Sequence, residues 1–272
     1  IPDCIRHVLT LDQRQVKGRY RRKDFIQQTD TLPEEKKWHP DSKLLRELEQ
    51  TEHAPSLSFR KALHMEDIHV QSGDSIILEH INWTVNRGEK WALLGHNGAG
   101  NVTLLSVITG DHPQAYANRI HLFDKKRGSG ESIWELKKKI GFVSPELHQY
   151  FRSENTCLNM VLSGFFDALV LSKKPSDEQV STAGKWLRLL DMEQLADKKF
   201  RHVSSGEQRL ILLVRALVKD PPLLILDEPC QGLDDEQKDH FRKGVETICD
   251  HPDKTMIYVT HYAEEIPDCV TS

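Results

Sequence analysis

The second half of the chain alternates between short apolar runs and longer stretches with helical periodicity. Four runs are typical of short buried strands: 90–94, 140–143, 223–226 and 256–260. Helical stretches lie between them, at 103–109, about 146–199, 205–218 and 235–249. Leu223–Leu226 is apolar throughout, as a strand that is covered on both faces should be. The pattern predicts an α/β domain with a largely parallel sheet and helices on both faces.

An antiparallel edge precedes this pattern. Residues 65–70 and 76–85 are typical of two paired strands, and an Asn-Arg-Gly turn at 86–88 leads into the first short run. We expect one compact domain over 62–272, which includes a helical subdomain at about 146–200.

The N-terminal part of the chain has a different character. Apolar positions at 5–11 and 15–18 predict a strand, a turn and a second strand, and we assign 1–26 to a hairpin. Residues 27–61 are polar, charged and interrupted by prolines, which predicts a linker with one short helix at 42–50.

Nearly the same five-residue sequence occurs at the start and near the end of the chain; we call this the five-residue echo. Ile1–Ile5 reads IPDCI and Ile266–Val270 reads IPDCV, but only the first copy continues into a strand-turn-strand. We interpret this as a tandem protein whose chain begins in the tail of an upstream unit. The hairpin is then expected to pack on a sheet edge, where the domain's own missing tail would lie.

Composition limits the class of protein. No apolar run approaches the roughly 20 residues that a membrane helix needs. A formal net charge of −4 argues against general nucleic-acid binding. Five cysteines without paired spacing are typical of reduced thiols, which predicts a cytoplasmic protein.

A glycine-rich loop follows the first short strand. It fits the phosphate-binding pattern G-x-x-x-x-G-K-[ST], in which backbone N–H groups surround phosphate oxygens. Asn101 takes the place of the Lys, and Val102 that of the Mg²⁺-binding hydroxyl. An ordinary turn is the alternative, but a strand before the loop and a helix after it favour an anion site. The candidate nucleotide-binding residues are Gly95, His96, Asn97, Gly98, Ala99, Gly100, Asn101, Val102 and Thr103.

Three polar side chains follow other strands. Asp227 ends a buried strand and is our candidate for holding Mg²⁺, while Glu228 is the candidate to polarise an attacking water. His261, just past the last strand, is the candidate contact for a γ-phosphate. The alternatives are a charged strand exit for the two carboxylates and a structural role for the histidine.

A fourth motif lies at the start of an apolar helix. Ser204 and Glu207 have the spacing of a helix capping box. With Ser205 and Gly206 they also form a small-residue helix N-terminus, which can meet a phosphate from another domain.

The order of these motifs resembles the ATP-binding cassette (ABC) ATPases. Residues 95–103 resemble the Walker A loop, 203–207 the signature motif and 223–228 the Walker B strand. Gly232–Asp234 resembles the D-loop, and His261 the switch histidine. The resemblance runs from about residue 65 to the C-terminus. It implies a P-loop NTPase-type fold, ATP and Mg²⁺ as cofactors, and a second cassette as partner.

Within this family the chain is most similar to tandem, molybdate-associated proteins of the ModF-like or photorepair type. Residues 109–114 (TGDHPQ) and 127–131 (RGSGE) carry this similarity to the second cassette of that group.

The chain departs from the family pattern at four positions. Besides Asn101 and Val102, Ser72 stands where an adenine-stacking aromatic is usual, and Pro145 stands where the Q-loop glutamine is expected. Because Glu228 and the switch histidine remain, we interpret the loop replacements as a recent or engineered change in a competent ATPase.

Three functions follow from the resemblance. The first is an ATPase that binds and hydrolyses ATP at a composite dimer site, with turnover weakened or abolished by the altered loop. The second is a non-catalytic half that lends its signature motif to a partner cassette. The third is the motor of a membrane permease, for example a molybdate transporter, at the inner face of the membrane. Pro145 weakens this third reading.

Overall fold

The computed structural model describes residues 7–12, 15–21, 41–49, 58–96, 98–146, 154–169, 171, 173–249 and 253–270. The chain divides into two compact units, residues 1–39 and 40–272. Each unit is described by itself.

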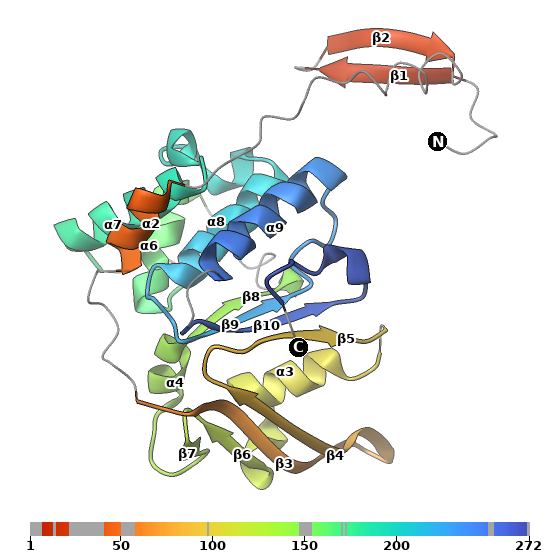
Figure 1. Cartoon of the computed structure of the whole chain (residues 1–272), viewed down its shortest axis with the longest axis vertical. Helices are drawn as coiled ribbons and strands as arrows, with labels where there is room; N and C mark the ends of the chain where they lie inside the picture. Colours follow the sequence, from red (N-terminus) through yellow and green to blue (C-terminus); the bar gives the residue numbers. More distant parts are fainter. Residues whose placement is uncertain are drawn as a thin grey trace. The chain divides into compact units, whose positions relative to one another are not determined.

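The described residues of the first unit form an antiparallel hairpin. Strand β1 (His7–Asp12) pairs with β2 (Gln15–Arg21), and the register shifts between Thr10 and Leu11. The strand-turn-strand that the sequence predicts is therefore confirmed (Figure 1). The first copy of the five-residue echo lies outside the described residues, and the packing of the hairpin on a sheet edge stays a prediction.

A four-stranded parallel sheet lies at the centre of the second unit. Its order is β5 (Lys90–Leu94), β10 (Thr255–Thr260), β9 (Leu223–Asp227) and β8 (Ile140–Val143). All three neighbouring pairs are parallel. Every residue of β9 and β10 is buried, which explains why both strands are apolar almost throughout. The predicted parallel sheet is confirmed.

A second, antiparallel sheet packs beside it. Its order is β4 (Ser75–Asn86), β3 (Lys61–Ser72), β6 (Arg119–Leu122) and the two-residue β7 (Lys125–Lys126). Helix α3 (Asn101–Thr109) lies between the two sheets in Figure 1, and its apolar side chains belong to one core with residues of β3, β9 and β10. The strand pair predicted at 65–85 is thus confirmed, and it is longer than predicted.

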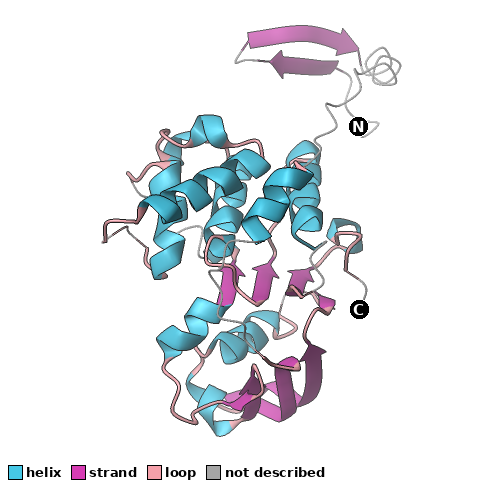
Figure 2. Cartoon of the chain, turned by 60° about the vertical axis from the view of Figure 1, so that its left-hand side comes forward, coloured by secondary structure: helices cyan, strands magenta, loops and turns pink. Residues whose placement is uncertain are grey.

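Most of the remaining helices gather at the other end of the unit, as Figure 2 shows. Around α8 (Ser205–Leu217) pack α6 (Cys157–Leu162), α7 (Asp177–Leu189) and α9 (Asp235–Cys249). Shorter elements complete the unit: η1 (Pro113–Ala117), α4 (Ile133–Lys139), η2 (Ser163–Phe166), η3 (Glu193–Leu195), η4 (Phe200–His202) and η5 (Ala263–Glu265). Among the described helices, none is both long and apolar enough to cross a membrane.

The short helix predicted near residue 42 is also present. Helix α2 (Ser42–Glu49) packs against α7, with an ion pair of 3.2 Å between Glu47 and Lys185. Although α2 falls in the segment that we expect to be a linker, it belongs to the same compact unit as the sheets.

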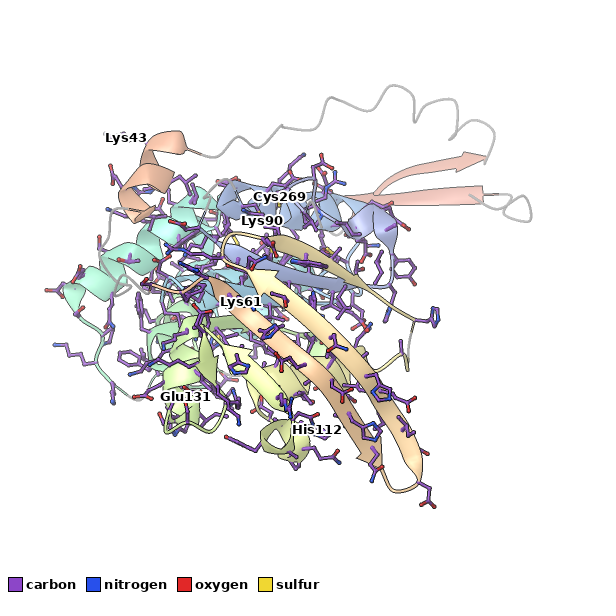
Figure 3. The ribbon with its side chains drawn as sticks, turned by 60° about the horizontal axis from the view of Figure 1, so that its bottom comes forward. Lys43, Lys61, Lys90, His112, Glu131 and Cys269 are labelled. Carbon is purple, nitrogen blue, oxygen red and sulfur yellow. The ribbon has the colours of Figure 1, made fainter. Side chains whose placement is uncertain are left out.

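Two sequence stretches that carry the similarity to the tandem group meet at the end of α3. Gly110 ends this helix with φ 83°, and the guanidinium of Arg127 occupies the space that a Cβ at Gly110 would fill. The same guanidinium lies 5.4 Å from the ring centroid of Tyr116. Figure 3 labels His112 and Glu131, which belong to these two stretches. The guanidinium nitrogens have no hydrogen-bond partner among the described residues, so the two stretches are joined here by packing against Gly110 and by the contact with the Tyr116 ring.

Candidate functional site

The carboxyl ends of three parallel strands bring the predicted site residues to one edge of the central sheet. In the register of the sheet, Leu94 pairs with Thr260, and Val259 pairs with Asp227. The segments that follow β5, β10 and β9 therefore begin side by side, which is where α/β sheets bind ligands.

The glycine loop joins β5 directly to the N-terminus of α3. Gly100 takes φ 95° as the residue before the helix, and a Cβ there would lie 2.9 Å from Leu78 and 3.2 Å from the carbonyl oxygen of Ile77. Only glycine combines this backbone conformation with so close an approach. Asn97 lies outside the described residues. The strand, loop and helix predicted from the sequence are confirmed, and α3 directs its free N–H groups toward the loop.

The side chains of Asn101 and Val102 have opposite surroundings. The Asn101 amide folds back onto Gly95, with both terminal atoms 2.9 Å from the position of a Cβ there. Its Nδ2 is buried and has no hydrogen-bond partner among the described residues. Val102 is 56% exposed and offers no oxygen to a metal. The loop thus holds one unsatisfied neutral donor where the family pattern has an ammonium.

His261 joins the ends of the three strands. Its Nδ1 contacts the carbonyl oxygen of Gly95, and its Nε2 forms an ion pair with Oε1 of Glu228 at 2.6 Å. Nε2 forms no hydrogen bond among the described residues, so its closeness to Glu228 is an ion pair only when the imidazole is protonated. Glu228 is held in a left-handed conformation, φ 41°, while its N–H donates to Val259 O at 2.9 Å. The histidine and the candidate base therefore lie next to each other beside the glycine loop.

Asp227 lies in an unfavourable place for a negative charge. Its side chain is 8% exposed, and burial raises its pKa to about 6, with further upward contributions from the charges of Glu228 and Glu146. The charge of His261 acts in the opposite direction. Glu146, which is not among the residues predicted for the site, follows β8 at the same edge of the sheet.

This raised pKa makes the stability of the chain dependent on pH. Between pH 3.8, the ordinary pKa of an aspartate, and about pH 6, Asp227 keeps a proton in the folded chain that it has lost in the unfolded chain. The free energy of unfolding therefore falls as the pH rises through this range. We expect Asp227→Asn to raise the free energy of unfolding at pH 8 by about 2 kcal/mol, and by much less at pH 4. Urea unfolding at both pH values measures this, and an equal gain at both would contradict it.

The signature motif forms the predicted helix cap. Ser204 N–H donates to Glu207 at 2.6 Å, and Glu207 N–H donates to the Ser204 hydroxyl at 3.3 Å. Ser204 and Ser205 are exposed, whereas Gly206 is buried against Gln237 of α9, whose side chain lies 2.7 Å from the position of a Cβ. The described hydrogen bonds of Ser204 and Glu207 stay within this first turn of α8, and none reaches the glycine loop.

A parallel sheet with a glycine loop before α3 and acidic residues at the end of β9 is the arrangement of a P-loop ATPase cassette. The chain matches the family model described as "ABC transporter" over residues 78–231, and it belongs to this family. It is 46% identical over 203 residues to the ABC transporter ATP-binding protein ModF of Escherichia coli, which covers 74% of this chain and 41% of ModF. It is 31% identical to an uncharacterized ABC transporter ATP-binding protein of Schizosaccharomyces pombe, over 99% of this chain and 54% of that protein.

Solved structures agree with this assignment. The chain is similar to CbiO1 from Clostridium perfringens, part of the ABC transporter complex CbiONQ, with TM-score 0.64 and 26% identity. That match covers 77% of this chain and 82% of CbiO1. By contrast, this chain spans only about half the length of the two relatives named above.

Proposed function

We propose that this chain binds ATP at the loop 95–103 and hydrolyses it slowly, as one half of a two-cassette assembly. One observation carries the proposal. The pair of His261 and Glu228 is assembled against Gly95 even though Asn101 and Val102 have replaced the loop's own chemical residues.

The loop fits a phosphate group. The buried Nδ2 of Asn101 lacks an acceptor among the described residues, and a phosphate oxygen would supply one. The free N–H groups at the start of α3 add further donors. Asn101 contributes no positive charge, so we propose that binding is weaker than with a Lys at this position.

The residues for Mg²⁺ fit in part. Asp227 would hold the metal, and its carboxylate becomes anionic above the pKa of about 6. Val102 contributes no ligand, and the hydroxyl of Thr103 is one position further along α3. When bound, the metal would neutralise part of the phosphate charge. Glu228 would orient and deprotonate a water, and His261 would donate to the γ-phosphate through Nε2 once that atom is released from Glu228.

A second cassette would complete the site. We propose that Ser204 and Ser205, exposed at the N-terminus of α8, contact nucleotide bound to that partner. The greater length of the ModF and Schizosaccharomyces pombe relatives supports a tandem arrangement. Such an assembly would be cytoplasmic, and it would lie at the inner face of the membrane if a permease also binds it, as membership in a transporter family suggests.

The altered loop also supports a second candidate function. In this reading the chain is a non-catalytic half that binds nucleotide poorly and lends Ser204–Gly206 to an intact partner loop. The exposed apolar side chain of Val102, where the family pattern has a hydroxyl, favours this alternative.

Titration of the chain with a fluorescent ATP analogue separates the two functions. For an active half we expect saturable binding that strengthens with Mg²⁺, and we expect Asp227→Asn to remove the Mg²⁺ effect but not the binding. Ser204→Ala serves as the matched control, since in a single cassette it should leave the titration unchanged. No binding, together with stimulation of a partner cassette's ATPase that Ser204→Ala abolishes, would instead establish the non-catalytic half.

A further inference from the structure

The segment that carries His261 is followed by a buried carboxylate, that of Glu265. The Glu265 side chain is 6% exposed, and its Oε2 accepts a hydrogen bond of 2.8 Å from the hydroxyl of Thr260. The same hydroxyl accepts from Tyr262 N–H at 3.2 Å, and Glu265 N–H donates to Tyr262 O at 3.2 Å. Since Thr260 and Tyr262 flank His261 in sequence, these three bonds fix the backbone on both sides of the imidazole.

The other oxygen of Glu265 reaches helix α9. Its Oε1 pairs with Nζ of Lys238 at 2.9 Å, and this hydrogen bond raises the pKa of Lys238. Lys238 N–H in turn donates to Asp234 O at 2.9 Å, in the first turn of α9. The preceding residue, Gln237, is the one that packs against Gly206. The first turn of α9 thus contacts the segment after His261, the residue Asp234 and the signature motif.

The Lys238–Glu265 pair lines the same pocket as the candidate catalytic residues. This pocket of about 280 Å³ is bounded by Glu228 and His261 as well as by the ion pair. If the buried carboxylate of Glu265 lost one of its two partners, part of its charge would be uncompensated, which is strongly unfavourable. The side chain is therefore held in the one position that contacts both Lys238 and Thr260. Movement of α9 at Lys238 would therefore displace Glu265 and, through Thr260, the imidazole.

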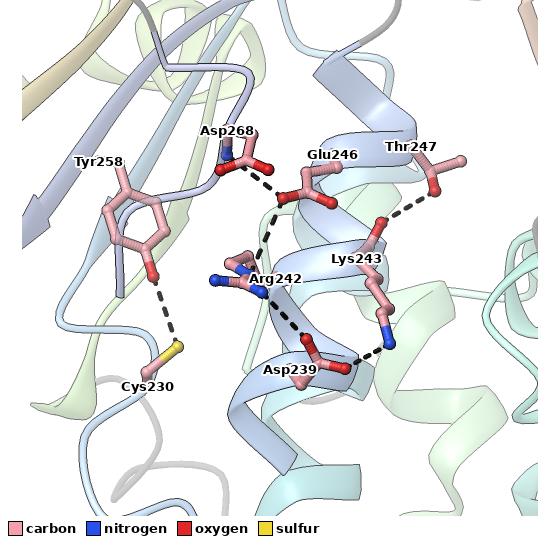
Figure 4. Close-up of polar contacts among 8 residues, drawn as sticks. All are labelled: Cys230, Asp239, Arg242, Lys243, Glu246, Thr247, Tyr258 and Asp268. Atoms are coloured by element: carbon pink, nitrogen blue, oxygen red, sulfur yellow. Dashed lines mark hydrogen bonds and ion pairs between the residues drawn. The ribbon is translucent and has the colours of Figure 1, made fainter. Parts of the chain in front are cut away.

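A second attachment to α9 lies farther along the chain, as Figure 4 shows. Asp268 N–H donates to Glu246 Oε1 at 3.2 Å, and Arg242 lies between Glu246 and Asp239. This attachment holds the segment that follows Glu265 but makes no bond to Thr260, so it provides a matched control.

We propose that Glu265 is a positioning residue for His261, holding its imidazole between Gly95 and Glu228. Through Lys238, Glu265 also links that position to the segment Gly232–Asp234. The inference deepens the proposed function and rests on it, because His261 matters for catalysis only if the chain hydrolyses ATP.

The geometry is tested without nucleotide. In the full chain labelled with ¹⁵N-histidine, the ring nitrogens of His261 are assigned by their loss in His261→Gln. We expect Glu265→Ala and, more weakly, Lys238→Met to shift these resonances toward those of a free imidazole. We expect Glu246→Gln to leave them in place. Unchanged His261 resonances in a folded Glu265→Ala chain would overturn the proposal. If that variant does not fold, unchanged resonances in Lys238→Met would overturn it.

The consequence for catalysis is tested in the chain that carries Asn101→Lys and Val102→Ser. There we expect Glu265→Ala to lower kcat by about ten- to a hundredfold, with little change in the KM for ATP. A change in KM alone would contradict the positioning role. If this background shows no turnover, the proposed ATPase function fails, whereas the histidine resonances still decide the role of Glu265.

Discussion

Replacing Asn101 by Lys and Val102 by Ser in this chain will strengthen its binding of Mg-ATP by about ten- to a hundredfold and raise its turnover. A charge-assisted contact to phosphate contributes about 1.5–3 kcal/mol, which corresponds to one to two factors of ten in affinity. The Asn101 side chain already lies inside the loop against Gly95, so a longer side chain starts from a position that faces the site. Nucleotide titration and phosphate release measure the two effects.

Two further variants show which residue provides each effect. Asn101→Lys alone should restore affinity, and adding Val102→Ser should mainly increase the dependence of turnover on Mg²⁺, because only the serine offers an oxygen ligand. Glu228→Gln in the double variant should leave binding intact and reduce turnover by at least a hundredfold. If the double variant neither binds nor hydrolyses ATP, the chain is not a competent ATPase with two altered residues.

The same substitution should change the electrostatics at Asp227. A lysine ammonium in the loop would offset the carboxylates of Glu228 and Glu146, which together with burial hold the pKa of Asp227 near 6. The pH-dependent loss of stability described above should therefore shrink in the Asn101→Lys variant. The charge at position 101 and the pKa of Asp227 are therefore expected to depend on each other.

The elements were predictable because their signals are local. Strand β9 is recognised from five apolar or acidic residues in a row, and α8 from the capping spacing of Ser204 and Glu207. The meeting of Gly95, Glu228 and His261 also follows from the sequence, once a parallel sheet is assumed, because each residue follows a strand.

The supporting residues could not be predicted in the same way. Glu265 and Lys238 lie 27 positions apart, and a charged residue on a helix or after a strand is usually solvated. Only the three-dimensional arrangement, which brings Lys238 of α9 and Thr260 of β10 to the same side chain, makes Glu265 a buried residue with two partners. Similarly, the sequence around Gly206 does not indicate that this glycine packs against Gln237 of α9.

Gly164→Ala will destabilise the chain by about 3 kcal/mol, because the added methyl group has no space. A Cβ at Gly164, in η2, would lie 2.1 Å from Arg215 O on α8 and 2.9 Å from the side chain of Val218, the residue that follows α8. Backbone atoms cannot move aside as a flexible side chain can. Relief would require η2 to separate from α8. That would strain the buried Arg215, whose guanidinium donates to the Ser163 hydroxyl at 3.0 Å and to Ala168 O at 2.9 Å.

The chain contains a matched control for this change. Gly184 lies inside α7, where a Cβ would meet nothing within 4 Å, so Gly184→Ala should stabilise the chain by about 0.5–1 kcal/mol through helix propensity alone. Urea unfolding of both variants measures the contrast. A cost below about 1 kcal/mol for Gly164→Ala would mean that η2 does not pack on α8 as closely as described.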